Sequence, residues 1–418
     1  GWHAGNDLVS GGYNVLFGYR AGTDTTGSQN VYIGRDAALF ATSGSYNVAF
    51  GNLALRGIEG NSTGGCNVAV GRYTGRSTTS GSFNVMLGDC AGFGVGSATD
   101  TIAIGRKAFE DNAFSSGSLT GTDNIGIGCL AGARMTSGAH NILMGNQSGR
   151  CQTTGSYNVA LGTGALVGSA TTTNNTGSCN IAIGKDAGGN VTSGVDNVLL
   201  GRRAGRSLTN NCRNVFMGPY TGDDATGISN VAIGSWAGSN MTSGGCNIII
   251  GMEAATGVIT GGNNILMGCK TANSITSGDK NIILGATAGQ ALTTGSENIF
   301  LGTNAGTAVA TGEGCSIAIG YLAYCGGEST GQQIFIGKQA GARHRGDTNI
   351  GIGVCALLGS STASANTGTD NIAIGQCSGE ANTSGTKNVF IGRAAGNTNT
   401  SGNCNIAIGY NIELPSAT

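Results

Sequence analysis

The sequence predicts an all-β protein, a parallel β-solenoid of about 23 coils. The pattern Asn, three apolar residues, Gly recurs from Asn14 to Gly409, usually 17 residues after the previous copy. Gly accounts for 79 of 418 residues and falls in phase with this repeat, whereas Pro occurs twice. A unit of 17 residues cannot bury a core alone, so neighbouring units must stack. The glycines and the Val/Ile-rich triplets also oppose a short helix as the repeating unit.

The Asn, counted here as position zero, opens each coil. It is present in 20 of 23 copies, and Thr101, Ser316 and Gln333 replace it in the others. Identical Asn side chains stacked in register can form a hydrogen-bonded ladder along the stack. We therefore expect a structural role for the row that begins with Asn14, Asn30, Asn47, Asn67, Asn84, Asn124, Asn141 and Asn158.

The three apolar residues form the strand. Position one is Val or Ile, position three is always large and apolar, and position two varies from Gly and Ala to Phe. Side chains alternate between the two faces of a strand, and a strand that is apolar on both faces is buried on both. We expect positions one and three to face the coil interior and position two to pack against another chain, in a parallel homotrimer or a dimer. The expected inter-chain axis includes Leu16, Met86, Leu143, Phe216, Phe300, Phe335 and Phe390.

Three corners close the coil. The Gly at position four is present in every copy, which indicates a sharp turn with positive φ. These turn glycines begin with Gly18, Gly34, Gly51, Gly71, Gly88 and Gly105. An Ala-Gly pair and a Thr-Ser-Gly triplet form the second and third corners.

Four coils carry extra residues between the second and third corners, at 56–62, 110–119, 168–175 and 359–366. Solenoids often place binding loops at such insertions. Only the second is distinctive, so Phe109, Glu110, Asp111 and Phe114 form a candidate receptor loop. Because the other three consist mainly of small and polar residues, we favour, for all four, tolerated insertions without a ligand.

Composition excludes several classes of function. The net charge of −1 argues against nucleic acid or an anionic membrane as a partner, and no apolar run is long enough to span a membrane. The three His residues are far apart, and neither a nucleophile elbow nor a phosphate-binding loop is present. We expect no catalytic residues, no metal, no cofactor and no enzymatic activity.

The 13 cysteines form no CxxC pair. Five of them precede the Asn position, four or more coils apart, which exceeds the reach of a disulfide. The five are Cys66, Cys179, Cys246, Cys315 and Cys404. Unpaired cysteines fit a protein assembled inside the cell.

The repeat covers residues 1–409, and residues 410–418 form an exit segment. Gly1 falls in the middle of a repeat unit, so we expect a fragment or a processed form of a longer protein.

The unit Asn-Val-Ala-Ile-Gly-x-x-Ala-Gly-x-x-x-Thr-Ser-Gly resembles the 17-residue repeats of bacteriophage tail-fibre shafts, over nearly the whole chain. The segment from Ile408 to Thr418 resembles the exit from such a shaft, which implies a self-cleaving intramolecular chaperone beyond it. The same triplets resemble the heads of trimeric autotransporter adhesins, although the repeat of those heads is shorter. Both resemblances imply a homotrimer.

These resemblances imply a structural fibre protein on a virion or an extracellular surface, involved in host attachment. Its partners would be copies of itself and a host surface glycan or protein receptor, without nucleic acid or membrane insertion. A cellular filament or trimeric surface adhesin is the alternative. An ice-binding solenoid is a third, but the Thr rows sit at a Gly corner and the insertions interrupt them.

Overall fold

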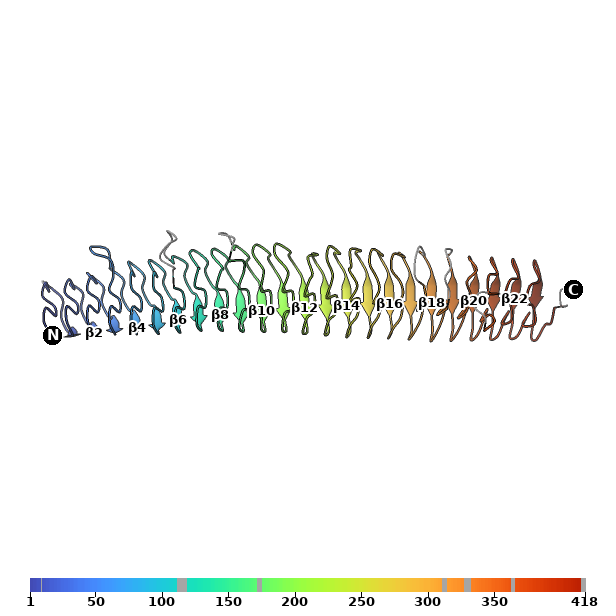
Figure 1. Ribbon diagram of the computed structural model, residues 1–418, viewed down its shortest axis with the longest axis horizontal. Helices are drawn as coiled ribbons and strands as arrows, with labels where there is room; N and C mark the ends of the chain where they lie inside the picture. The colour runs from blue at the N-terminus through green and yellow to red at the C-terminus, as the bar shows by residue number, and fades with distance from the viewer. Residues whose placement is uncertain are drawn as a thin grey trace. The chain divides into compact units, whose positions relative to one another are not determined.

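The computed structural model describes residues 1–8, 10–110, 119–170, 175–309, 314–326, 332–361 and 365–414. Its described elements are strands of three residues, each followed by a loop that leads to the next strand (Figure 1). The predicted parallel β-solenoid is therefore confirmed. Contacts divide the chain into two units, Gly1–Asn214 and Val215–Thr418.

The first unit holds strands β1 to β11. Their bounds are β1 Val15–Phe17, β2 Val31–Ile33, β3 Val48–Phe50, β4 Val68–Val70, β5 Val85–Leu87, β6 Ile102–Ile104, β7 Ile125–Ile127, β8 Ile142–Met144, β9 Val159–Leu161, β10 Ile181–Ile183 and β11 Val198–Leu200.

The second unit holds strands β12 to β23. Their bounds are β12 Val215–Met217, β13 Val231–Ile233, β14 Ile248–Ile250, β15 Ile265–Met267, β16 Ile282–Leu284, β17 Ile299–Leu301, β18 Ile317–Ile319, β19 Ile334–Ile336, β20 Ile350–Ile352, β21 Ile372–Ile374, β22 Val389–Ile391 and β23 Ile406–Ile408.

Within each unit, every strand pairs in parallel with the strand that follows it in sequence. The register joins equivalent positions of neighbouring coils, for example Ile142 with Val159 and Leu143 with Ala160. The same register holds in the second unit, where Ile265 pairs with Ile282. Equivalent residues of successive coils therefore form continuous rows within a unit.

The core of each coil lies on the opposite side of the strand from the one expected. From β2 to β22, the position-two side chains point into their own coil and are fully enclosed by it, whereas positions one and three face outwards. The expected inter-chain axis is therefore wrong. Met86, Leu143, Phe216, Phe300, Phe335 and Phe390 are completely buried within the single chain, and Leu16, in the first coil, is half-buried.

Position two can hold either a small or a large residue, because other core residues of the same coil compensate in size and keep the interior filled. Phe216 fits because its coil has Gly222, where a Cβ would lie 2.5 Å from the Phe216 ring. In the next coil Ala232 is small, and Met241 at position eleven fills the space. The size variation that suggested a shared axis is therefore packing inside the coil.

The turn glycines are required by close backbone contact as well as by conformation. The expected set Gly18, Gly34, Gly51, Gly71, Gly88 and Gly105 has φ between 121° and 140°. A Cβ on Gly145, in the same row, would lie 2.6 Å from the carbonyl carbon of Gly162 in the next coil. No side chain fits where two coils approach this closely.

Left-handed backbone also occurs at residues that are not Gly, directly before the Asn, at position six and, in some coils such as that of Phe109, at position eight. Tyr157, directly before the Asn, has φ of 59°, and Gln147, at position six, has φ of 58°. Bulky residues rarely adopt this region. Inter-coil hydrogen bonds hold both backbones, because Tyr157 N–H donates to Ala139 and Gln147 N–H to Cys129, at 3.0 and 2.8 Å.

The buried Asn row forms a ladder that closes each coil and joins it to the next. Asn141 donates its backbone N–H to Oδ1 of Asn124 at 3.0 Å and its Nδ2–H to the Gly155 carbonyl at 3.0 Å. Its own Oδ1 accepts the backbone N–H of Asn158 at 2.9 Å. Bonds of these kinds involve Asn14, Asn30, Asn47, Asn67, Asn84, Asn124, Asn141 and Asn158.

Candidate functional site

The most extensive unusual surface is the outward side of the strands, which we call the strand face. It consists of the side chains at positions one and three. Ile181 and Ile183 of β10 are 38% and 40% exposed, and Met267 of β15 is 38% exposed. In all 23 strands these two positions are apolar, so each unit carries an uninterrupted apolar stripe. Soluble monomers rarely expose contiguous apolar patches of this extent.

Two rows of residues border the strand face. One rim is the residue after the turn Gly, and the other is the residue before the Asn. In the first unit the first rim carries exposed Arg35, Arg72, Arg106, Lys185 and Arg202, with Asp89 as its single acid. The second rim carries exposed Asp100, Asp123 and Asp196, with Arg213 as its single Lys or Arg. The two borders of the apolar stripe thus differ in charge.

The described residues of the candidate receptor loop do not form a binding surface. Phe109 is only 2% exposed, because its ring fills the space above Gly126 of the next coil, where a Cβ would lie 2.5 Å from it. Glu110 forms an ion pair with Lys107 at 3.1 Å. Asp111 and Phe114 lie outside the described residues. Phe109 is therefore a core residue, contrary to the expectation.

The other three insertions each end on a buried polar residue that ties down the loop. Asn175 donates Nδ2–H to the Cys151 carbonyl at 2.7 Å and accepts the Ser169 N–H at 3.0 Å. Asn366 makes the equivalent bonds in its coil. Ser62 accepts the Ile58 N–H and donates to the Thr78 carbonyl. These residues support the extra loop from the core side.

The reactive side chains do not converge on a centre. The 13 cysteines are free, and in the described part of the chain no three His, Cys, Asp or Glu residues gather where a metal could bind. Cys355 and Cys377 occupy equivalent positions of neighbouring coils, a pair that the sequence analysis missed. The pKa of Cys377 is raised to about 11, mainly by burial and to a lesser extent by a hydrogen bond to Glu380.

His344 differs from the other histidines because it is completely buried at position eleven. Neither of its ring nitrogens makes a hydrogen bond of regular geometry with the described residues, and its ring lies 6.2 Å from that of Phe335. Burial lowers the pKa of His344 to about 4, so the ring is neutral near pH 7. Its environment fits a core residue.

No described helix is long and apolar enough to cross a membrane. Comparisons of the chain with protein-family models, curated proteins and solved structures found no significant match. The strand face and the repeat are therefore the features that bear on function.

Proposed function

We propose that this chain is a structural fibre protein, the shaft of a tail fibre or spike that contributes to host attachment from a virion or an extracellular surface. In this proposal three parallel copies assemble with their strand faces turned towards a common axis. The strand face carries the proposal, because it is apolar at both outward positions of all 23 strands. The resemblance to tail-fibre shafts favours three copies over two.

The exposed apolar area is large enough to drive assembly. Complete burial of an Ile side chain contributes about 1.5–3 kcal/mol. An Ile that is 38% exposed, such as Ile181, would therefore gain roughly 1 kcal/mol when a partner covers it. Two residues of this exposure per coil over about ten coils would give roughly 10–20 kcal/mol, which is comparable with the estimated 4–15 kcal/mol cost of association.

The charges on the two rims favour a parallel cyclic arrangement. Rotation about an axis along the stack places the first rim of one chain beside the second rim of the next. In the first unit this brings the basic side chains near Asp100, Asp123 and Asp196. Exposed ion pairs contribute little affinity, but they can fix orientation and register.

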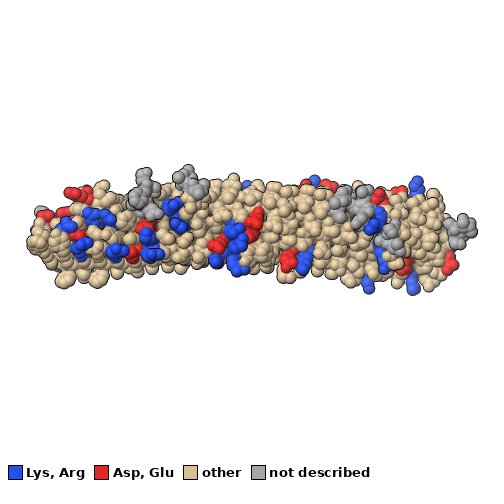
Figure 2. All heavy atoms as spheres, viewed as in Figure 1, with Lys and Arg blue, Asp and Glu red and all other residues tan. Residues whose placement is uncertain are grey.

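A structural role also agrees with the rest of the surface. Only 10% of the residues are charged, and the face seen in Figure 2 carries its Lys, Arg, Asp and Glu residues in small separate groups. The scattered His and Cys side chains favour a scaffold over an enzyme.

Light scattering on the full chain tests the assembly. We expect the mass of three chains, and a trimer band that persists in cold SDS and is lost on heating. Ile248→Lys combined with Met267→Lys should lower the temperature at which the trimer band is lost in SDS, because both side chains are 38% exposed on the strand face. Val258→Lys is the matched control, since Val258 is 54% exposed but lies in a loop.

A wild-type mass of one chain would refute the proposal, and a mass of two would replace the trimer with a dimer. Circular dichroism should show that the double variant keeps its strands, because neither side chain enters the coil. The gene neighbourhood separates the two settings. Capsid and tail genes support a virion fibre, whereas a membrane anchor supports a cellular filament.

A further inference from the structure

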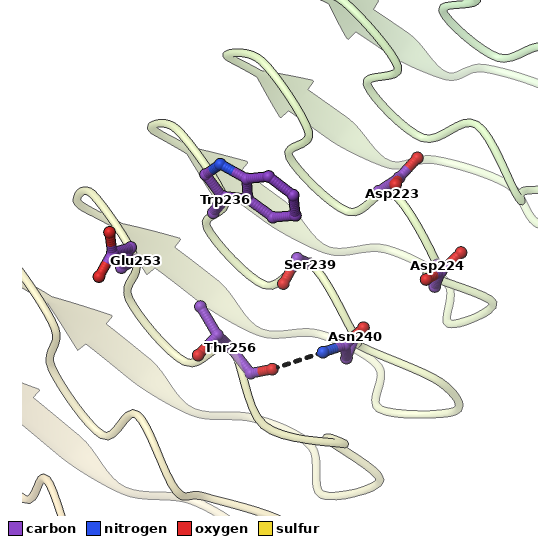
Figure 3. A pocket seen from close by; sticks show the side chains of 7 residues that line it. All are labelled: Asp223, Asp224, Trp236, Ser239, Asn240, Glu253 and Thr256. Carbon is purple, nitrogen blue, oxygen red and sulfur yellow. Dashed lines mark hydrogen bonds between the residues drawn. The ribbon is translucent and has the colours of Figure 1, made fainter.

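A shallow cavity opens on the loop side of the coils that carry β12, β13 and β14. Its volume is about 360 Å³, within the range of roughly 300–1,000 Å³ that is usual for small-molecule sites. The residues that line it are Asp223, Asp224, Trp236, Ser239, Asn240, Glu253 and Thr256 (Figure 3). All belong to the second unit, and three carry carboxylates while none is a cation.

Trp236, which lines this cavity, belongs to an aromatic pair. Tyr220 and Trp236 occupy position six of successive coils, and their rings stack with centroids 4.3 Å apart and planes 12° from parallel. Trp236 remains 44% exposed. Tyr220 covers the indole from the preceding coil, and the next coil places Glu253 at the same position. The second face of the indole is therefore turned towards the coil of Glu253.

Inter-coil hydrogen bonds fix the backbone at Trp236 and at Glu253. Trp236 N–H donates to the Pro219 carbonyl at 3.1 Å, and Glu253 N–H donates to the Ser235 carbonyl at 2.9 Å. Each coil is therefore fixed to the one before it. An aromatic platform that is already rigid loses little conformational entropy when a ligand binds.

Polar groups surround the exposed indole. Asn240 donates its Nδ2–H to the Thr256 carbonyl at 2.8 Å, which orients the amide (Figure 3). Ser239 lies between Trp236 and this amide in the view. Thr256 provides a second hydroxyl from the next coil. Asp223 and Asp224 lie on the opposite side from Glu253, whose Oε2 is 3.5 Å from Nζ of Lys270. A flat apolar surface is thus bordered by hydrogen-bond acceptors and hydroxyls.

We infer that this cavity binds one uncharged pyranose ring of a saccharide. A pyranose has an apolar C–H face that can pack on the indole of Trp236, and hydroxyl groups at its edge that can donate to carboxylates. Hydrogen bonds to ionised acceptors are about twice as strong as neutral ones. No Lys or Arg is among the described residues that line the cavity, so the carboxylate of an anionic sugar would find no cationic partner in this lining.

The expected affinity of one such subsite is low. For a ring of about twelve non-hydrogen atoms, the efficiency of typical ligands gives a Kd on the order of 1 mM. Several copies of the site on one assembly would strengthen attachment to a surface that displays many sugars. The site itself lies within one chain, so its test does not depend on the proposed trimer.

The chain contains two Trp residues, which makes the test specific. In a Trp2→Phe background, Trp236 is the only indole. Methyl α-D-glucopyranoside, methyl β-D-galactopyranoside and methyl N-acetyl-β-D-glucosaminide are titrated separately to about 50 mM. We expect a saturable change in Trp236 emission with at least one of them, at a Kd on the order of 1 mM.

Saturation-transfer NMR with the same sugars then tests the residues. Trp236→Ala should abolish transfer, and Glu253→Gln should weaken binding about five-fold, the loss expected for a charge-assisted hydrogen bond. Tyr157→Ala is the matched control, because Tyr157 also belongs to an exposed ring stack, 4.8 Å from His140, but lies outside the cavity. Circular dichroism identical to wild type shows that the loss is local, since Trp236 is not a core residue.

Four results would overturn the inference. They are no response to any of the three sugars, binding that survives Trp236→Ala, preferential binding of N-acetylneuraminic acid, and an emission change with calcium chloride alone. The last result would identify a cation site formed by the carboxylates. Because the readout is binding to the full chain in solution, it is separate from the mass measurement that tests assembly.

Discussion

Removal of one Asn side chain from the ladder should open the solenoid locally. In Asn141→Ala, the backbone N–H of Asn158 loses its acceptor, and the Gly155 carbonyl loses its donor. Asn141 is completely buried and Asn158 is 1% exposed, so water does not replace either bond in the closed coil. Asn158 keeps the bond from its own Nδ2 to the Gly177 carbonyl.

The magnitude follows from these two orphaned groups. A buried N–H without a partner costs about 1–3 kcal/mol, and a buried carbonyl somewhat less. The total is about 3 kcal/mol, which corresponds to roughly a 150-fold increase in the opening equilibrium. Each coil contacts only its neighbours, so the effect should remain within the coils of β7, β8 and β9.

Hydrogen–deuterium exchange resolved by peptide is the suitable assay, because unfolding of a long repeat array need not be two-state. Amides of β8 and β9 should exchange roughly 150-fold faster in Asn141→Ala, while those of β1 and β2 should be unchanged. Asn146→Ala is the control, since Asn146 is exposed in the next loop and its side chain lies outside the ladder. Equal exchange in the two variants would refute the role of the ladder.

Three other substitutions test the coil interior. Gly145→Ala should open the coils of β8 and β9, because its Cβ would lie 2.6 Å from the next coil at φ of 137°. Gly12→Ala, with open space around it, should leave hydrogen exchange unchanged. Gly126→Ala should lower the local stability by about 2 kcal/mol through overpacking against Phe109. Phe109→Leu in the same chain should recover most of this loss, measured by hydrogen exchange of the β7 amides. Burial lowers the pKa of His344 from 6.5 to about 4 in the folded protein. The free energy of unfolding of its coil should therefore be constant above pH 6.5 and fall by up to about 3 kcal/mol as the pH drops to 4. Below pH 4 it should level off. His344→Leu should remove that part of the pH dependence of exchange, and an unchanged pH profile would count against a buried neutral ring.

Short-range features of the fold could be predicted from the sequence because each is decided within one or two coils. The 17-residue period requires stacking, an invariant Gly requires a turn that no Cβ can enter, and repeated Asn residues can bond in register. The left-handed backbone at Tyr157 and Gln147 could not be predicted, because side chains of every kind occupy these positions.

A further buried row, formed by the residues at position eleven, was also not predicted. Position eleven lies in the variable stretch, yet Val95, Val191, Leu208 and Leu292 are fully buried there. The available signal was an apolar residue three places after the Ala-Gly corner in many coils. His344 and Asn382 at the same position obscure it in the later coils.

The Trp236 cavity could not be predicted because its lining comes from three coils with no shared motif. Tyr220, Trp236 and Glu253 become neighbours only when the register stacks position six. In sequence they are separated residues in variable positions. One sequence taken by itself offers no signal that selects this group over equivalent rows elsewhere.

The assignment of position two to an inter-chain axis was wrong, and the Asn ladder contained the correction. Side chains alternate along a strand, so the Asn and position two share one side and positions one and three share the other. A buried Asn row therefore places position two inside the coil. The apolar character of both faces concealed this, because hydrophobicity alone does not show which face belongs to the chain's own core.

The residues at positions one and three suit self-assembly better than those at position two. In a parallel, in-register homo-oligomer, each level brings identical residues together at the axis. Position two ranges from Gly126 to Phe300, so identical partners would leave a void at one level and collide at another. Positions one and three vary much less, with Val or Ile at the first and mostly Ile, Leu or Met at the second. Rows of nearly constant size can pack against copies of themselves at constant spacing, which is the requirement that a symmetric shaft imposes at every coil.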